Sequence, residues 1–397
     1  MAAGPRLAAG RWLALRRTMS QLRLSLRSPR LRRRATEGVL DPTEAAAARD
    51  VIRGWHGYDA TPLVTLPGLA ALLGVEAVWV KDESSRFDLG SFKSLGGAFA
   101  VLRALQDQIE RRSGVRPSAA ELRAGHPLAP KITVTTASAG NHGRSVAWGS
   151  AEFGCPCVVF LPEDAIQARA LAIESHGAEV VRVAGPYDAV VGHTDRKAAR
   201  NGWIVVSDTA YEGYEETPRR VMAGYTLLAA EMLEQLAAAG ARPLTHLFVQ
   251  AGVGGLATGV CGHFAQQCGD ERPRFVAVEP WRADCFGRSL RLGRASVAEP
   301  PFDTAMGGLA AGVASTIAWE FLEPLLDAAL ALPEAVWAAG AEALESGRLG
   351  ARITAGPSGA AGIGALLALA ALPGLRRLLG LDASARVGAL VTETRFD

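Results

Sequence analysis

Lysine is scarce in this sequence. Among its 42 lysine and arginine residues, the lysines are Lys81, Lys93, Lys131 and Lys197. Arginine replaces lysine on a solvated face at little cost, but guanidinium stays protonated and forms no Schiff base. Lys93 lies where an apolar, helix-like segment begins, and a helix entrance attracts anions. It is therefore a candidate nucleophile, although a solvated lysine at a loop–helix junction fits this stretch alone equally well.

Cysteine is also sparse, and no long apolar run occurs. The five cysteines are odd in number and form no CxxC pair, so reduced core thiols are expected and a metal site is not; they are Cys155, Cys157, Cys261, Cys268 and Cys285. No run reaches the roughly 18 apolar residues of a membrane span. The formal net charge of +2 argues against a nucleic-acid binder. We therefore expect neither a membrane nor a nucleic-acid partner.

Acidic residues are absent from residues 1–36, which contain ten arginines. Removing these ten charges from the net +2 leaves the rest of the chain at about −8. Such a composition resembles an organellar transit segment. A disordered basic tail, or a true start at Met19, explains it more simply. We expect a disordered tail.

The body of the chain predicts an α/β fold. Asp41-Pro42 favours a helix start, and residues 75–81 favour a strand. Residues 133–207 alternate as β-α-β-α-β-α-β, which is typical of a parallel sheet with helices on its faces. A helix at 218–239 precedes strands at 245–250 and 275–279. Residues 281–315 look irregular, helices are expected at 317–326 and 334–347, and a last strand at 387–391.

We expect two domains, each an open, mostly parallel twisted sheet with helices on both faces, and a ligand site in the cleft between them. The predicted division has four parts. These are a tail (1–36), the first part of a large domain (37–95), a small α/β domain (96–215) and the remainder of the large domain (216–397).

A glycine-rich loop follows the strand at 245–250. It contains Gly252, Val253, Gly254, Gly255 and Leu256. Small residues let several backbone N–H groups converge on an anion at a helix start. A dinucleotide fingerprint fails on glycine spacing. A glycine turn without a ligand remains the alternative.

Three further loops follow predicted strands. In Ser138-Ala139-Gly140-Asn141, backbone N–H groups and the Ser138 hydroxyl suit a carboxylate, and the Asn141 amide suits a phenolate; a left-handed Asn at a turn is the alternative. His142 beside it is more often structural. Asp208 ends another strand and suits proton handling, whereas Glu215-Glu216 suits a solvated face.

The last of these positions is Thr392, whose hydroxyl suits an unprotonated ring nitrogen, although an ordinary strand-end threonine has the same sequence. An amine, a phosphate cup, an amide for a ring oxygen and a hydroxyl for a ring nitrogen together describe a site for pyridoxal 5′-phosphate.

These loops, in this order, resemble the tryptophan-synthase-β-like group of fold-type-II pyridoxal phosphate enzymes, and within it diaminopropionate ammonia-lyase. The stretches that carry the resemblance are VKDESSRFDLGSFKSLGGAFA, GNHGRSVAW, DTAYEGYEETP, QAGVGGLATG and the terminal VTE. The likeness extends over about residues 37–397.

The resemblance implies that Lys93 forms the Schiff base and removes the α-proton. It implies that Asn141, residues 252–256 and Thr392 bind the cofactor, and that Asp208 contacts the substrate amine or assists elimination. Substrate-binding residues implied in the same way are Ser138, Ala139, Gly140, Asn141, Asp208 and Tyr211. The implied reaction is α,β-elimination of L-2,3-diaminopropionate to pyruvate and ammonia.

Two positions depart from the family pattern. Lyases that use both enantiomers have an acid before Gly-Asn-His, where this chain has Ala139; Thr394 stands where glycine is usual. Ala139 predicts loss of D-isomer turnover. A serine/threonine-type dehydratase or another β-eliminating or β-replacing enzyme is the alternative, followed by a non-catalytic cofactor binder and an NAD-dependent dehydrogenase. We expect a cytoplasmic homodimer.

Overall fold

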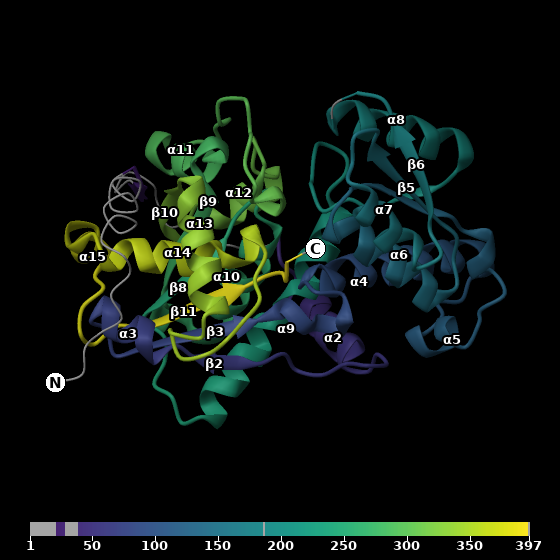
Figure 1. Cartoon of the computed structure of the whole chain (residues 1–397). Coiled ribbons are helices and arrows are strands. Elements are labelled where there is room, and N and C mark those ends of the chain that lie inside the picture. Colours follow the sequence, from purple (N-terminus) through teal and green to yellow (C-terminus); the bar gives the residue numbers. More distant parts are fainter. Residues whose placement is uncertain (1–20, 28–38, 186, 396–397) are drawn as a thin grey trace.

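The computed structural model describes residues 21–27, 39–185 and 187–395. They form two lobes, each built on its own sheet, with the end of the chain leading to the boundary between them (Figure 1). The two-domain α/β class expected from the sequence is confirmed.

The larger sheet has seven strands, and its five inner strands are parallel. The two edge strands run antiparallel to their neighbours. In spatial order the strands are β1 (Arg23–Leu26), β10 (Leu326–Leu332), β9 (Arg274–Pro280), β8 (His246–Gln250), β11 (Arg386–Val391), β3 (Ala77–Asp82) and β2 (Leu63–Thr65).

The smaller sheet has four strands, all parallel. In spatial order they are β6 (Glu179–Val183), β5 (Cys157–Pro162), β4 (Val134–Ala137) and β7 (Ile204–Val205). This is the β-α repeat that the sequence predicts between residues 133 and 207.

Helices cover both sheets (Figure 1). The α-helices are α2 (Pro42–Arg53), α3 (Pro67–Leu73), α4 (Lys93–Ser113), α5 (Ala119–Arg123), α6 (Asn141–Phe153), α7 (Gln167–Glu174), α8 (Tyr187–Asn201), α9 (Glu216–Ala238), α10 (Gly255–Cys268), α11 (Cys285–Leu292), α12 (Thr316–Leu322), α13 (Glu334–Glu345), α14 (Pro357–Ala370) and α15 (Pro373–Leu379). Short 3-10 helices are η1 (Glu83–Asp88), η2 (Ala129–Lys131), η3 (Gly269–Glu271), η4 (Trp281–Ala283) and η5 (Gly307–Leu309).

The helix boundaries follow local chemistry. The Asp41 side chain accepts a hydrogen bond from the Thr43 backbone N–H at 2.8 Å, and Pro42 occupies the first turn, so α2 begins where the sequence predicts. Helix α3 ends at Gly74, whose φ of 65° suits glycine.

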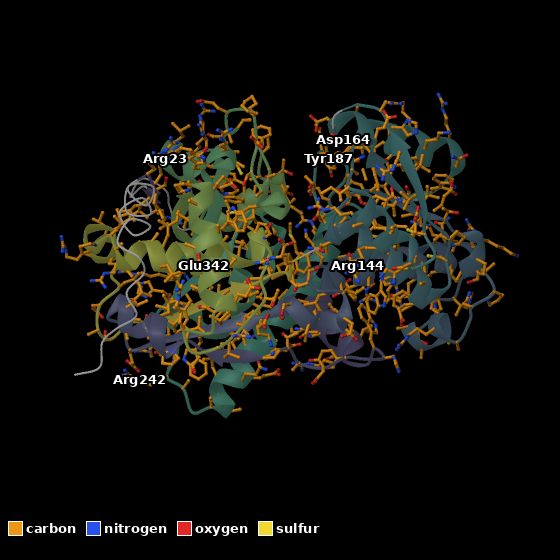
Figure 2. The ribbon with its side chains drawn as sticks, viewed as in Figure 1. Arg23, Arg144, Asp164, Tyr187, Arg242 and Glu342 are labelled. Carbon is orange, nitrogen blue, oxygen red and sulfur yellow. The ribbon has the colours of Figure 1, made fainter. Side chains whose placement is uncertain are left out.

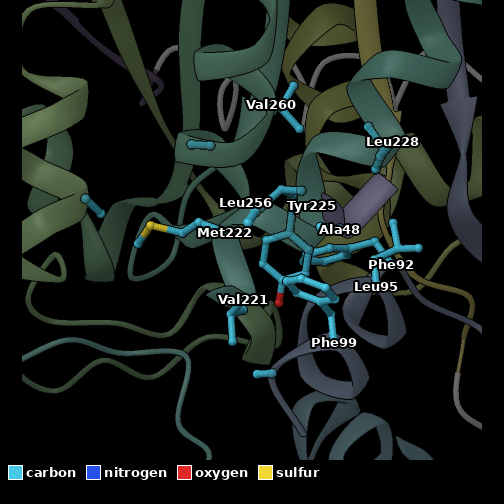
Figure 3. Packing of buried hydrophobic residues seen from close by; sticks show 14 of the residues in the cluster. Ala48, Phe92, Leu95, Phe99, Val221, Met222, Tyr225, Leu228, Leu256 and Val260 are labelled. Carbon is cyan, nitrogen blue, oxygen red and sulfur yellow. The ribbon is translucent and has the colours of Figure 1, made fainter. Parts of the chain in front are cut away.

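Alternating residues of the large sheet pack on opposite faces. In β8, Leu247 and Val249 belong to one buried apolar cluster and Phe248 belongs to another. This alternation follows from the strand period of two and requires helices on both faces. The first cluster also contains side chains of α4, α9 and α10 (Figure 3).

Helix α4 connects the lobes by close backbone packing. A Cβ at Gly149 of α6 would lie 2.6 Å from the Ala98 Cα, and one at Gly224 of α9 would lie 2.3 Å from the Leu95 carbonyl oxygen. Helix α4 therefore lies against both α6 and α9. The proposed division of the chain at residues 95 and 215 stays a prediction.

Three expectations were wrong. Arg23–Leu26, within the expected disordered tail, forms β1 on the edge of the large sheet; the rest of that tail lies almost wholly outside the described residues. The predicted helix at 317–326 ends at Leu322, and a missed strand, β10, begins at Leu326. The segment 281–315 contains α11 as well as loops.

In the described part of the chain, no single helix has the length and apolarity to cross a membrane. Helices α14 and α15, bent by 113° relative to each other, meet the length and composition criteria only as a pair.

Candidate active site

Lys93 is the first residue of α4, and its ammonium contacts a carboxylate from the small lobe. The Lys93 Nζ donates to the Asp208 Oδ2 at 2.5 Å, across 115 positions of sequence. Asp208 follows β7, so two predicted catalytic residues meet at the boundary of the lobes. Their side chains are 18% and 20% exposed, which leaves both reachable by a small ligand.

The two groups stabilise each other's charge. Burial lowers the pKa of Lys93, but the Asp208 carboxylate outweighs burial, so this pKa lies above its ordinary value. Burial likewise raises the pKa of Asp208, and the Lys93 charge more than offsets it, so this pKa lies well below its usual range. The pair is an ammonium and a carboxylate at neutral pH.

His142 lies on the other side of Asp208. Its Nε2 is 2.9 Å from the Val206 carbonyl oxygen, which can only accept, so Nε2 carries the proton. The Nδ1 is then unprotonated, 3.9 Å from the Asp208 Oδ2. Burial lowers the pKa of His142, which keeps the ring neutral. A neutral imidazole therefore lies next to the Asp208 carboxylate. The sequence analysis interpreted His142 as structural.

Asn141 begins α6, and its amide donates a hydrogen bond to a glutamate from the other lobe. The Asn141 Nδ2 donates to the Glu393 Oε2 at 2.7 Å, and the Asn141 Oδ1 is buried without a hydrogen bond to the described residues. An unsatisfied buried amide oxygen is costly, so this end of the side chain suits a ligand.

The glycine loop lies directly before α10. Gly254 has a φ of 98°, and a Cβ there would lie 2.6 Å from the Phe286 ring, so the loop requires glycine at this position. Helix α10 has no side-chain cap, which leaves first-turn N–H groups available to an anion. A Cβ at Gly255 would lie 3.9 Å from the Asp208 carbonyl oxygen, so the loop borders the Lys93–Asp208 pair.

The remaining residues of this loop are fixed by their neighbours. The Val253 carbonyl accepts from the Ser315 N–H at 2.9 Å, and Gly252 lies against the Gly308 backbone. Leu256 is buried within α10. The five residues predicted to bind the phosphate, 252–256, therefore run directly into the start of α10, as the sequence predicts.

Thr392 directly follows β11 and is buried. Its carbonyl accepts from the Phe92 N–H at 3.2 Å, which places it one residue from Lys93. Thr394 packs its methyl group where a Cβ of Gly90 would lie, and its N–H donates to the Gly90 carbonyl at 2.8 Å. Thr394, which the sequence analysis identified as a departure from the expected pattern, thus packs against a glycine of the Lys93 loop.

The predicted substrate loop precedes α6. The Gly140 N–H donates to the Ser138 Oγ at 3.3 Å, and a Cβ at Gly140 would meet open space. Ala139 is partly buried beside them. Tyr211 lies differently: it is 44% exposed and stacks on Tyr214 at 5.0 Å between ring centroids.

Two tyrosines near the pair were not foreseen. Tyr225 of α9 is fully buried, its hydroxyl makes no hydrogen bond to the described residues, and its ring lies edge-on to Phe92 (Figure 3). Tyr187 begins α8 on the small lobe (Figure 2), and its hydroxyl donates to the Ala137 carbonyl at 3.0 Å. Tyr187 is 55% exposed as a residue, but desolvation of its hydroxyl, followed by the Asp208 charge, raises the pKa of Tyr187 to about 12. Neither residue belongs to a recognisable motif.

A pyridoxal phosphate group fits these residues. The uncapped start of α10 suits its phosphate, the second Nδ2 hydrogen of Asn141 suits its ring oxygen, and the Lys93 amine suits its aldehyde carbon. Among the described residues, no group of three or more His, Cys, Asp or Glu side chains is placed to hold a metal ion.

Comparison with known proteins agrees with this class of site. The family described as "Pyridoxal-phosphate dependent enzyme" matches residues 55–393, and the chain belongs to this family. The resemblance inferred from the sequence and the identity of the cofactor are thereby confirmed.

The more specific likeness is to diaminopropionate ammonia-lyase. The enzyme of Escherichia coli K12 is 36% identical over 370 residues, 91% of each chain. A crystal structure of the E. coli enzyme "in complex with D-serine" has a TM-score of 0.85 and 34% identity over 94% of each chain. A probable D-serine dehydratase of Burkholderia thailandensis is 32% identical over 260 residues, 62% of this chain and 57% of the relative.

Proposed function

We propose that this protein catalyses the α,β-elimination of L-2,3-diaminopropionate to pyruvate and ammonia. The observation that carries the proposal is the contact between Lys93 and Asp208 at the border of the glycine loop. The similarity of this chain to diaminopropionate ammonia-lyase, over 91% of each chain, supports the assignment of diaminopropionate as the substrate. A serine/threonine-type dehydratase, or another β-eliminating or β-replacing enzyme, is the second candidate, favoured by the likeness to a probable D-serine dehydratase.

Four parts of the chain would hold the cofactor. They are the amine of Lys93, the amide of Asn141, the loop formed by residues 252–256 and the hydroxyl of Thr392. When bound, pyridoxal phosphate supplies an electron-accepting ring for the negative charge that develops at the substrate α-carbon.

The Lys93 amine would then act as the base. With substrate in the site, the Lys93 amine would be free, neutral and close to the α-carbon, and it would accept the α-proton. Breakage of the bond between the β-carbon and nitrogen sends the electron pair to nitrogen, which leaves as ammonia. Water replaces the second nitrogen, so the overall products are one pyruvate and two ammonia.

We expect the Asp208 carboxylate to pair with a different cation when substrate binds. In the structure described, its carboxylate is neutralised by Lys93. Once Lys93 is covalently engaged and uncharged, the carboxylate needs another cation, because an unpaired buried charge is costly. We propose that the β-ammonium of the substrate takes this place, which holds the leaving group beside a carboxylate.

The substrate carboxylate would lie at the start of α6. The Ser138 hydroxyl, the backbone beside Ala139 and the open space at Gly140 are suited to an anion at a helix N-terminus. Tyr211, expected here by resemblance, lies exposed on Tyr214, so its contact with substrate stays a proposal that requires movement of its loop.

Ala139 sets the proposed stereochemistry. Its methyl group cannot accept a proton, and Lys93 is the base proposed for the L-isomer. We expect pyruvate release from L-2,3-diaminopropionate and at least about 100-fold slower release from the D-isomer, the usual contribution of a general base. Comparable rates on the two isomers would contradict this reasoning.

A substrate panel tests the proposed function. Purified protein with added cofactor is assayed for ammonia, pyruvate and 2-oxobutanoate from diaminopropionate, serine and threonine. Highest turnover on diaminopropionate supports the lyase, and highest turnover on the hydroxyl substrates supports the dehydratase. No turnover, despite covalent cofactor, indicates a non-catalytic binder. An NAD-dependent dehydrogenase is disfavoured by the family assignment.

We also propose a homodimer located in the cytoplasm. The five cysteines are free thiols, as a reducing compartment permits. Sedimentation of the purified protein at several concentrations tests the dimer, and fractionation of the source cells tests the location.

A further inference from the structure

The carboxylate of Glu393 lies between the starts of two helices from different lobes. Its Oε2 accepts from the Asn141 Nδ2 of α6 at 2.7 Å, and its Oε1 accepts from the Ser358 N–H of α14 at 3.1 Å. Because both partners are donors, the group acts as an acceptor on both oxygens. A carboxylate is also favoured by the positive ends of both helix dipoles.

The backbone of Glu393 is held as firmly as its side chain. Its carbonyl accepts from the Gly356 N–H at 3.0 Å, and its main chain forms a bridge with Ser91, two residues before Lys93. A Cβ at Gly359 would lie 2.3 Å from the Glu393 carbonyl oxygen, so α14 packs directly on this backbone. The carboxylate is therefore fixed relative to the Lys93 loop.

We propose that Glu393 is a positioning residue that sets the orientation of the Asn141 amide across the lobe boundary. One Nδ2 hydrogen of Asn141 is committed to Glu393, so the amide cannot rotate by 180° without facing its oxygen toward a carboxylate. The second Nδ2 hydrogen is then available to the ring oxygen of the cofactor. This inference rests on the cofactor contact proposed for Asn141 and does not depend on the substrate.

A purely structural role is the competing explanation. Glu393 also caps α14, whose N-cap residue Gly356 has no side chain to do so. A cap stabilises the apoprotein regardless of Asn141. The two roles are therefore separated by asking whether the effect of Glu393 on cofactor binding depends on Asn141.

The experiment is a double-mutant cycle on cofactor affinity. Apoproteins of wild type, Glu393→Gln, Asn141→Ala and the double variant are titrated with pyridoxal phosphate and followed by absorbance and circular dichroism of the bound cofactor. The control is Glu345→Gln, because Glu345 is an exposed partner of Arg395 close to the same chain end. Melting of the four apoproteins reports the capping contribution.

Glu393→Gln is expected to weaken cofactor binding about tenfold or more and to alter the dichroism of the bound cofactor, since the single oxygen of glutamine cannot accept from both the Asn141 Nδ2 and the Ser358 N–H. In the Asn141→Ala background, the same change is expected to have an effect of about twofold or less. Glu345→Gln is expected to bind like wild type.

Wild-type affinity and dichroism in Glu393→Gln would overturn the proposal, as would an equal loss in both backgrounds. If Glu393→Gln does not fold, Glu393→Asp replaces it, because the shorter side chain keeps the charge and cannot reach both helices; the same dependence on Asn141 is expected. Failure of the wild type to bind the cofactor would instead refute the proposed function, so the two failures are distinguishable.

Discussion

Replacement of Asp208 by asparagine tests how the site controls the charge of Lys93. The substitution keeps an oxygen that can accept from the Lys93 Nζ, now 2.5 Å from the carboxylate, and removes only the negative charge. Burial, which lowers the pKa of Lys93, is then unopposed by its principal neighbour. The pKa of Lys93 is therefore expected to fall in Asp208→Asn.

The size of the effect follows from the short contact and the limited exposure of both side chains. An opposite charge within hydrogen-bond reach changes a protonation equilibrium by about 1.4–4 kcal/mol, which is about a ten- to a thousandfold change in the fraction of neutral amine. At a fixed pH near neutrality, Lys93 of the variant should therefore capture the cofactor aldehyde faster per binding event than wild type.

The assay is stopped-flow mixing of apoprotein with saturating cofactor over a range of pH. The midpoint of the pH–rate curve should move to lower pH in Asp208→Asn. Catalytic turnover should fall by about 10²–10⁴, because Asp208 no longer holds the leaving group. The control is Asp107→Asn, which removes a carboxylate of α4 that pairs with Arg116 and with Arg220 of α9. An unchanged or higher midpoint in Asp208→Asn would refute the reasoning.

Three further substitutions have defined outcomes. Gly254→Ala forces a Cβ to within 2.6 Å of the Phe286 ring at a φ of 98°, so we expect a loss of about 1–3 kcal/mol in unfolding free energy and weaker cofactor binding, with Gly374→Ala, which meets open space, as the unaffected control. Burial raises the pKa of Glu279 from 4.5 to about 8. Because the pKa in the folded state is the higher one, the stabilisation from protonated Glu279 is fully present below pH 4.5 and is lost as the pH rises through 8. Glu279→Gln should flatten this fall, worth up to about 5 kcal/mol, in urea unfolding at several pH values, and an unchanged pH dependence would count against it. Tyr225→Phe removes a buried hydroxyl without a hydrogen bond to the described residues, so apoprotein stability should not fall, and a loss above about 1 kcal/mol would contradict this.

The site loops were predictable because they combine two local properties. Each follows a β-branched strand and contains residue types that serve backbone turns or ligands, as Asp208 and Gly254 do. Lys93 follows β3 of the large sheet and Asp208 follows β7 of the small sheet, so the expected cleft between the two sheets brings together residues 115 positions apart.

Residues outside these loops that lie next to the site were not predictable from the sequence. Tyr225 lies in the middle of a long amphipathic helix, where its spacing indicates only a core position. Glu393 follows a strand end in a motif that resemblance identified without a role. The contacts of both depend on how α9, α6 and α14 approach one another, and sequence periodicity does not contain that information.

Strand β10 shows why one element was misread. Apart from Asp327, its sequence, LDAALAL, consists of alanine and leucine, which favour helices in isolation. The strand lies between β1 and β9 with nearly every residue buried, so packing against both faces outweighs intrinsic preference.

The scarcity of lysine also has two explanations in this chain. Lys81 is fully buried, and its Nζ contacts the Glu231 Oε2 at 2.6 Å and the Thr61 carbonyl at 2.6 Å. The same Glu231 carboxylate also pairs with the buried Arg86, so Lys81 belongs to a structural ion-pair cluster. Scarcity alone therefore does not identify the nucleophile: Lys81 has a structural ion pair, and Lys93 is the lysine proposed for the chemistry.

The most direct test of the central claim uses this scarcity. Holoprotein is reduced with borohydride, digested and mapped by mass spectrometry, so that every lysine able to carry the cofactor is compared with the others. We expect the reduced cofactor on Lys93 and on none of Lys81, Lys131 or Lys197. An adduct on another lysine, or none despite bound cofactor, would contradict the assignment of Lys93 as the covalent residue of the site.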